Sequence, residues 1–309
     1  MFEPYTNQVR LLLRVLPLVA QEEVFALKGG TAINLFERDL PRLSVDIDLT
    51  YLPFDDRETA LRTITAALKR LKAKIDAIIG DVKVTLVTQS DGTEAKLHCQ
   101  SQTAQIKIEV NTVMRGHIFP PRLMSCTAKV QKTLGAFAEI NVISQGELYG
   151  GKICAALDRQ HPRDLFDVKL LLENEGITEA IKVGMIAALI SHPRPINEVL
   201  FPNFRDQRAL FEAQFDGMAL LPFSYEDYEA ARFRLKAAIK EALSPNDREF
   251  LVTFKSGQPD WSLQGNPNFP LMPAIQWKLL NIQKLKADNL SKHASMLAKL
   301  ITKLAAFRN

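Results

Sequence analysis

The sequence has few of the features that mark secreted or membrane-spanning proteins. Its three cysteines, Cys99, Cys126 and Cys154, are odd in number and lack the CxxC or Cys/His spacing of zinc sites. We interpret them as reduced thiols, which favours a cytoplasmic protein. The apolar run at 11–20 is interrupted by an arginine and a proline and has no signal-peptide cleavage pattern. No stretch is long enough to span a bilayer, so we expect no membrane partner.

The sequence also lacks internal repeats, low-complexity segments and a strong excess of one charge. Hydrophobic residues make up 47% and charged residues 24% of 309 residues, which suits a folded chain of about two domains. The net charge of +4 is too small to prove a nucleic-acid partner. Residues 277–309, however, hold many lysines and a single acid, Asp288. This concentration of positive charge would suit a polyanion.

Hydrophobic periodicity predicts strands and helices in the first third of the chain and helices in the rest. Strands are expected at 24–27, 44–52, 82–87, 93–99 and 105–113, and helices at 7–22, 32–38 and 56–79. Further helices are expected at 147–159, 162–175, 178–191, 225–242 and 247–255, followed by a long helix from Ala274. A domain boundary near residue 140 separates the domains 1–140 and 141–309.

Two adjacent glycines, Gly29 and Gly30, lie between the strand at 24–27 and the helix at 32–38. Thr31 is the expected N-cap of that helix. Glycines let the backbone approach a ligand closely, and the free N–H groups at a helix start favour an anion such as phosphate. By itself, a glycine pair is more typical of plain chain reversal.

Asp46 and Asp48 occupy alternate positions of the strand at 44–52. Residues i and i+2 of a strand point to the same face, so the two carboxylates lie side by side. Like charges so close repel each other unless a cation lies between them. Mg²⁺ (or Mn²⁺) prefers carboxylate oxygens and substrate phosphates, as in phosphoryl-transfer enzymes. The alternative for an isolated pair of this kind is a solvated sheet face.

Lys107 and Glu109 repeat the alternation in the strand at 105–113. The intervening apolar residues are expected to face the core, so Glu109 would supply a third carboxylate to the metal. A cross-strand ion pair involving Lys107 and Glu109 is an equally good interpretation of this spacing.

Two cations and two acids flank a His-Pro corner at 161–162. Lys152 and Arg159 are seven residues apart on one helix face, and Asp164 and Asp167 share a face of the next helix. Taken alone, the segment is more typical of surface salt bridges, with Asp164 complementing a helix N-terminus.

The order of these motifs resembles that of the AbiEii/AbiGii-type toxin nucleotidyltransferases. The matching segments are Lys-Gly-Gly-Thr at 28–31, Arg-Leu-Ser-Val-Asp-Ile-Asp at 42–48, Lys-Ile-Glu at 107–109 and Arg-Asp-Leu-Phe-Asp at 163–167. The resemblance continues at 192–202 and 273–282 and so covers nearly the whole chain. It implies an α+β protein, with a DNA polymerase β-like nucleotidyltransferase domain followed by a mostly helical domain.

The resemblance also implies a function and a set of site residues. Such proteins are toxins of toxin–antitoxin or abortive-infection systems, and some transfer a nucleoside monophosphate from an NTP to the 3′ end of tRNA. The expected partners are therefore an NTP, tRNA or another RNA, and a cognate antitoxin. The implied nucleotide-binding residues are Gly29, Gly30, Thr31, Ser44, Lys152 and Arg159. The implied metal ligands are Asp46, Asp48 and Glu109, and the implied essential acid is Asp167 or Asp164.

Three hypotheses about function remain open from the sequence. The acceptor is an RNA, or it is a protein or small molecule, or the chain only binds nucleotides without catalysis. The intact aspartates and the Lys152 motif disfavour the last. Lys292, Lys299 and Lys303 form one stripe at i, i+7 and i+11 and favour RNA, with a solvated helix face as the alternative.

Overall fold

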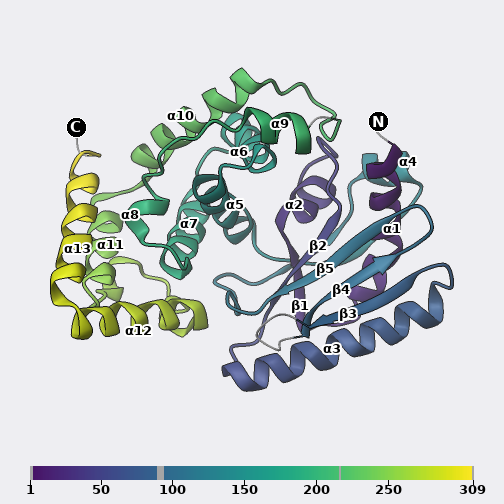
Figure 1. Cartoon of the computed structure of the whole chain (residues 1–309), viewed down its shortest axis with the longest axis horizontal. Coiled ribbons are helices and arrows are strands. Elements are labelled where there is room, and N and C mark those ends of the chain that lie inside the picture. Colours follow the sequence, from purple (N-terminus) through teal and green to yellow (C-terminus); the bar gives the residue numbers. More distant parts are fainter. Residues whose placement is uncertain (1–2, 89–93, 216, 308–309) are drawn as a thin grey trace. The chain divides into compact units, whose positions relative to one another are not determined.

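The computed structural model describes residues 3–88, 94–215 and 217–307 (Figure 1). The chain divides into two compact units. The first comprises Met1–Ser144 and Phe215–Pro222, and the second comprises Gln145–Gln214 and Phe223–Asn309.

The described part of the first unit contains one sheet of seven strands, in the order β3-β4-β5-β2-β1-β7-β6. The strands are β1 (Phe25–Lys28), β2 (Asp46–Tyr51), β3 (Lys83–Thr88), β4 (Glu94–Gln100), β5 (Gln105–Asn111), β6 (Arg122–Ser125) and β7 (Glu139–Val142). The helices are α1 (Glu3–Val19), α2 (Gly29–Ala32), α3 (Arg57–Ile78) and α4 (Ala128–Leu134), with one π-helical turn, η1 (Ile33–Glu37). Residue 93, where one predicted strand begins, lies outside the described residues.

The sheet is mixed, and β2 lies near its centre. Strand β2 pairs antiparallel with β1 and parallel with β5, while β1 pairs parallel with β7. Helices α1 and α3 pack against strands of this sheet, as Figure 1 shows. Together with the helical second unit, this arrangement confirms the predicted α+β class.

The alternation predicted for β2 and β5 is confirmed by burial. Ile47 and Leu49 of β2 are fully buried, and so is Ile108 on β5. The residues between them point to the other face of the sheet. The carboxylates of Asp46 and Asp48 therefore share one face of β2.

The described residues of the second unit form helices without strands. They are α5 (Gln145–Arg159), α6 (Pro162–Asn174), α7 (Glu179–Ser191), α8 (Ile196–Val199), α9 (Arg208–Gln214), α10 (Tyr225–Ala242), α11 (Pro245–Lys255), α12 (Pro273–Asp288) and α13 (Leu290–Ala305), with the short turns η2 (Trp261–Leu263) and η3 (Phe269–Leu271). Across the described chain, none of the helices combines the length and the apolar composition that a bilayer crossing requires.

The prediction of one long helix from Ala274 was wrong. The helix is interrupted at Asn289, which has an extended backbone with φ −151°. Its side chain accepts a hydrogen bond from the Lys292 N–H at 2.9 Å and so caps a new helix, α13. Helices α12 and α13 run in different directions (Figure 1).

Helices α5 and α7 cross at unusually close range, and glycines make this possible. A Cβ on Gly184 would overlap the backbone of Gly146, and a Cβ on Gly150 would overlap the backbone of Gly184. Helix α5 carries Lys152 and Arg159, so this crossing positions part of the predicted site.

We expect Gly184→Ala to lower the free energy of unfolding by about 1–3 kcal/mol, because the added methyl forces the two backbones apart. Nucleotidyl transfer should fall as well, since α5 moves. Gly151→Ala is the matched control, because a Cβ there meets nothing within 4 Å. Chemical denaturation of both variants measures the difference, and equal stabilities would contradict the close-packing role of Gly184.

Candidate active site

The turn between β1 and α2 lies directly against the predicted metal ligands. Gly29 has φ +73°, in the left-handed region that favours glycine. A Cβ on Gly29 would lie 2.5 Å from Asp48 Oδ2, so no larger side chain fits. Lys28, which precedes it, is paired with Asp48 in the β1–β2 register. The glycine is therefore required both by its conformation and by its distance from Asp48.

Gly30 faces a second pair of polar side chains. A Cβ on Gly30 would lie 2.8 Å from a terminal guanidinium nitrogen of Arg42 and 2.8 Å from Ser44 Oγ. Arg42 is only 2% exposed, and its Nη1 donates to the Leu43 carbonyl at 2.9 Å. Sequence reasoning did not assign Arg42 to the site. A signal was its position, two residues before Ser44 in the Arg-Leu-Ser-Val-Asp-Ile-Asp motif.

The prediction that Thr31 is an N-cap was wrong. The left-handed conformation of Gly29 lets the helix begin directly after β1, so Thr31 lies inside α2 and Lys28 is the cap. Thr31 is fully buried. Its hydroxyl donates to the Asp46 carbonyl and lies 3.1 Å from Ser44 Oγ. Thr31 thus ties the glycine turn to the start of β2.

Asp46 and Asp48 lie opposite Lys107 and Glu109 in the β2–β5 register. Lys107 Nζ lies 3.6 Å from Asp46 Oδ1, and Glu109 Oε2 lies 3.0 Å from Nζ of Lys96 on β4. Lys107 therefore offsets part of the charge of Asp46. Glu109 makes a cross-strand ion pair, although with Lys96 and not with Lys107.

A cavity of about 230 Å³ opens beside this part of the sheet. Lys28, Asp48 and Glu109 line it together with the end of β5 and the following residue. Among the described residues there is no group of three or more metal-ligating side chains. The donor pair of Asp46 and Asp48 nevertheless suits Mg²⁺, which commonly takes one or two carboxylates and completes its shell with phosphate and water.

The Lys152 cluster lies in the second unit, where α5 meets α6. Lys152 Nζ lies 2.8 Å from Asp164 Oδ1 and 3.1 Å from Asp167 Oδ2, and Arg159 Nε lies 2.5 Å from Asp164 Oδ2. Lys152 is 7% exposed and each aspartate 1%. The four residues therefore meet, with Lys152, Asp164 and Asp167 buried and Arg159 pairing with Asp164 from an exposed position.

Two opposing effects act on the Asp164 carboxyl. Burial by itself would raise its pKa, but the Lys152 ammonium and the Arg159 guanidinium hold the pKa well below its ordinary value. Asp164 is therefore ionised at every pH at which the protein is expected to work. It anchors Lys152 and Arg159 as a permanent negative charge.

The remaining predicted residues are on α13. Lys292 and Lys299 are exposed, and Lys303 is half-buried. Lys303 Nζ donates to the Asn197 carbonyl at 3.3 Å. The stripe thus extends from exposed positions to a more enclosed one.

The predicted site residues fall into two groups. The first unit holds the glycine turn, Ser44, the two aspartates and Glu109, and the second holds the Lys152 cluster and the α13 lysines.

Comparison with known proteins identifies the family. The family model described as "Nucleotidyl transferase AbiEii toxin, Type IV TA system" matches residues 10–280. The structure of MenT4, a nucleotidyltransferase toxin from Mycobacterium tuberculosis, superimposes with a TM-score of 0.58 and 14% sequence identity, covering 90% of this chain and 93% of that chain. No curated protein matches in sequence. The family match covers most of the sequence, both glycines of the turn, both aspartates and the Lys152 cluster, so the chain belongs to the AbiEii nucleotidyl transferase toxins of type IV toxin–antitoxin systems.

Proposed function

We propose that this nucleotidyltransferase moves a nucleoside monophosphate from an NTP to an RNA acceptor, the 3′ end of a tRNA, and so inhibits translation in the cytoplasm. The observation that carries the proposal is the same-face pair Asp46 and Asp48, held against the Gly29–Gly30 turn. A cognate antitoxin is the expected partner, as the family description implies.

The residues of the first unit account for nucleotide binding. Mg²⁺, when bound, would neutralise charge on the triphosphate and on the departing pyrophosphate. Asp46 and Asp48 would hold the ion, because their carboxylates share one face of β2. Gly29 and Gly30 would bring the backbone N–H groups of the turn close to the carboxylates, since neither residue has a side chain that would displace Asp48, Arg42 or Ser44. Thr31 and Ser44 would hold the turn in place behind them.

The transfer itself exchanges one bond for another. The acceptor hydroxyl oxygen bonds to the α-phosphorus of the NTP, the bond from that phosphorus to the bridging oxygen breaks, and pyrophosphate leaves. The hydroxyl proton passes to solvent. Lys152 would stabilise the charge that develops on the phosphates. Asp164 and Asp167 are almost fully buried against Lys152, which favours positioning of Lys152 over contact with the acceptor hydroxyl.

We expect Asp46→Ala and Asp48→Ala each to abolish transfer while leaving the melting temperature near that of the wild type. Each change removes a metal ligand without opening the apolar core, since both side chains are only half-buried. Labelled NTP incubated with total tRNA or with protein extract measures transfer and shows which acceptor takes the label.

The double variant should be no worse than either single variant, because loss of one ligand already disables the ion. Glu109→Gln tests whether Glu109 is a metal ligand or only an ion-pair partner. Near-wild-type transfer is expected if Glu109 serves only the ion pair with Lys96. Retention of more than a tenth of the wild-type rate in either aspartate variant would contradict the metal assignment.

Lys152→Met should lower the free energy of unfolding by about 3–5 kcal/mol, because it leaves buried carboxylates without their main counter-charge. The same change in an Asp164→Asn/Asp167→Asn background should lower the free energy of unfolding much less.

The stability of the protein should also depend on pH through Asp164. Because folding lowers the pKa of Asp164, its contribution to stability is present above the ordinary value of 3.8 and is lost as the pH falls below it. Denaturation at several pH values measures both effects.

Lys152→Arg tests the catalytic role of Lys152 separately. It keeps the charge but not the shape of the ammonium, so it should retain most of the stability and restore turnover poorly. A Lys152→Arg or Lys152→Ala variant with unchanged turnover and a lower melting temperature would assign Lys152 to structure alone.

Expression of the wild-type chain should arrest bacterial growth, and the arrest should require Asp46, Asp48, Lys152 and Asp167.

The α13 stripe is tested by changing Lys292, Lys299 and Lys303 to glutamine. This variant should bind RNA more weakly, show a weaker salt dependence of binding and relieve the arrest, because each lysine that contacts a phosphate releases counterions. Growth curves and binding at several salt concentrations measure these effects. Normal growth with the wild type would contradict the toxin proposal.

A further inference from the structure

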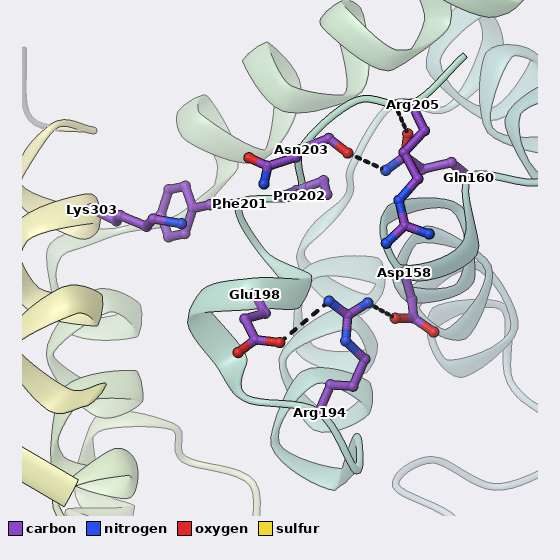
Figure 2. A pocket seen from close by; sticks show the side chains of 9 residues that line it. All are labelled: Asp158, Gln160, Arg194, Glu198, Phe201, Pro202, Asn203, Arg205 and Lys303. Atoms are coloured by element: carbon purple, nitrogen blue, oxygen red, sulfur yellow. Dashed lines mark hydrogen bonds and ion pairs between the residues drawn. The ribbon is translucent and has the colours of Figure 1, made fainter. Parts of the chain in front are cut away.

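A second cavity, of about 200 Å³, lies in the second unit. Figure 2 shows its lining side chains, which come from the end of α5, from the segment that follows α7 and from α13. We call it the Arg205 cavity. Its other charged lining residues are Asp158, Arg194, Glu198 and Lys303.

The two acids that line the Arg205 cavity, Asp158 and Glu198, both pair with Arg194. The Arg194 guanidinium lies 2.5 Å from Asp158 Oδ1 and 3.4 Å from Glu198 Oε2, and the dashed lines in Figure 2 mark both contacts. Arg194 therefore balances one of the two negative charges. With Arg205 and Lys303 included, the three cations of the lining outnumber its two acids, so the lining has a net charge of +1.

The backbone of Arg205 is anchored on both sides, while its guanidinium is exposed. Its N–H donates to Gln160 Oε1 at 3.1 Å, and its carbonyl accepts from Arg232 at 2.7 Å. No hydrogen bond or ion pair involves the guanidinium within the part of the chain that the structure describes. Arg205 thus presents an uncompensated cation from a fixed position.

The ammonium of Lys303 makes no ion pair with any residue that the structure describes. It donates to the Asn197 carbonyl at 3.3 Å and lies 5.5 Å from the centre of the Phe201 ring. The ring of Phe307 packs on Phe201 at 4.9 Å. These contacts hold the ammonium in place without cancelling its charge.

The end of α5 and the residue after it contribute to both the Arg205 cavity and the Lys152 cluster. Asp158 and Gln160 line the cavity, and Arg159 between them pairs with Asp164, to which Lys152 also binds. The cavity and the cluster therefore share one short segment, 158–160.

These features fit one kind of ligand. A lining of net positive charge, in which Arg205 and Lys303 make no ion pair with described residues, suits a phosphodiester together with the exposed amide of Asn203, because a phosphodiester offers charged oxygens to donors. Phe201 is the one aromatic residue among the described lining residues, and it already contacts Lys303 and Phe307, which favours backbone binding over a stacked base. We propose that the Arg205 cavity binds a backbone phosphodiester of the RNA acceptor, without reading its sequence. This inference rests on the proposed function for the identity of the acceptor.

The test compares Arg205→Gln/Lys303→Gln with a charge-matched control, Lys132→Gln/Lys236→Gln, whose lysines are exposed and lie outside the cavity. Fluorescence anisotropy with labelled total tRNA measures affinity at several salt concentrations. The cavity variant should bind RNA at least about tenfold more weakly, with a salt slope reduced by about two. In the control variant, the RNA affinity and the salt slope should change only as far as its lower net charge implies.

Asn203→Asp provides an independent variant, since it adds a negative charge to the cavity with almost no change in volume. It should weaken RNA binding, and its KM for RNA should rise while turnover at saturating RNA stays near the wild-type value. MgATP affinity should be unchanged in every cavity variant. Loss of MgATP affinity in parallel with RNA affinity would identify a free-nucleotide site and overturn the inference.

The remaining outcomes test the cavity inference and the proposed function separately. Wild-type affinity for RNA in all cavity variants would overturn the inference while leaving RNA labelling by the wild type intact. Cavity-dependent RNA binding by a wild-type enzyme that labels only protein would support the cavity and refute RNA as the acceptor.

Discussion

The site in the first unit depends on the close approach of the glycine turn to β2. Gly29 lies so near Asp48 that a Cβ would reach 2.5 Å from its carboxylate, and Gly30 is as close to Arg42 and Ser44. Because no side chain separates the turn from the strand, a ligand bound by the backbone is also within reach of the carboxylates. The seven-stranded sheet of the described residues fixes this distance by pairing Lys28 directly with Asp48.

The paired aspartates of the two units lie in different electrostatic environments. Asp46 and Asp48 are half-buried on a polar sheet face, where solvent and Lys107 reduce their mutual repulsion. Asp164 and Asp167 are almost completely buried, and these two carboxylates are balanced by Lys152 between them and by Arg159, which pairs with Asp164. The first pair is accessible to a cation from solution, whereas the second already has its cation in the chain.

Strong periodicity made β2, β5 and most helices predictable, because a half-buried strand or helix must alternate its apolar residues. The four-residue strands β6 and β7 and the short helix α4 were missed, since they are too short to show a period. The break at Asn289 was missed because the apolar pattern resumes beyond it. Spacing predicted which residues of the Lys152 cluster meet, but not their burial, which depends on tertiary packing.

Gln160 shows why the corner between α5 and α6 could not be predicted from the local sequence pattern. It has φ 51°, a left-handed conformation that a non-glycine residue adopts at a cost of about 1–3 kcal/mol. Its side chain contacts the Asn203 carbonyl, the Arg205 N–H and the guanidinium of Arg232. These contacts offset the backbone cost, and the contact with Arg232 comes from α10. The conformation that ends α5 and turns the chain into α6 is thus set by residues about 40 to 70 positions away.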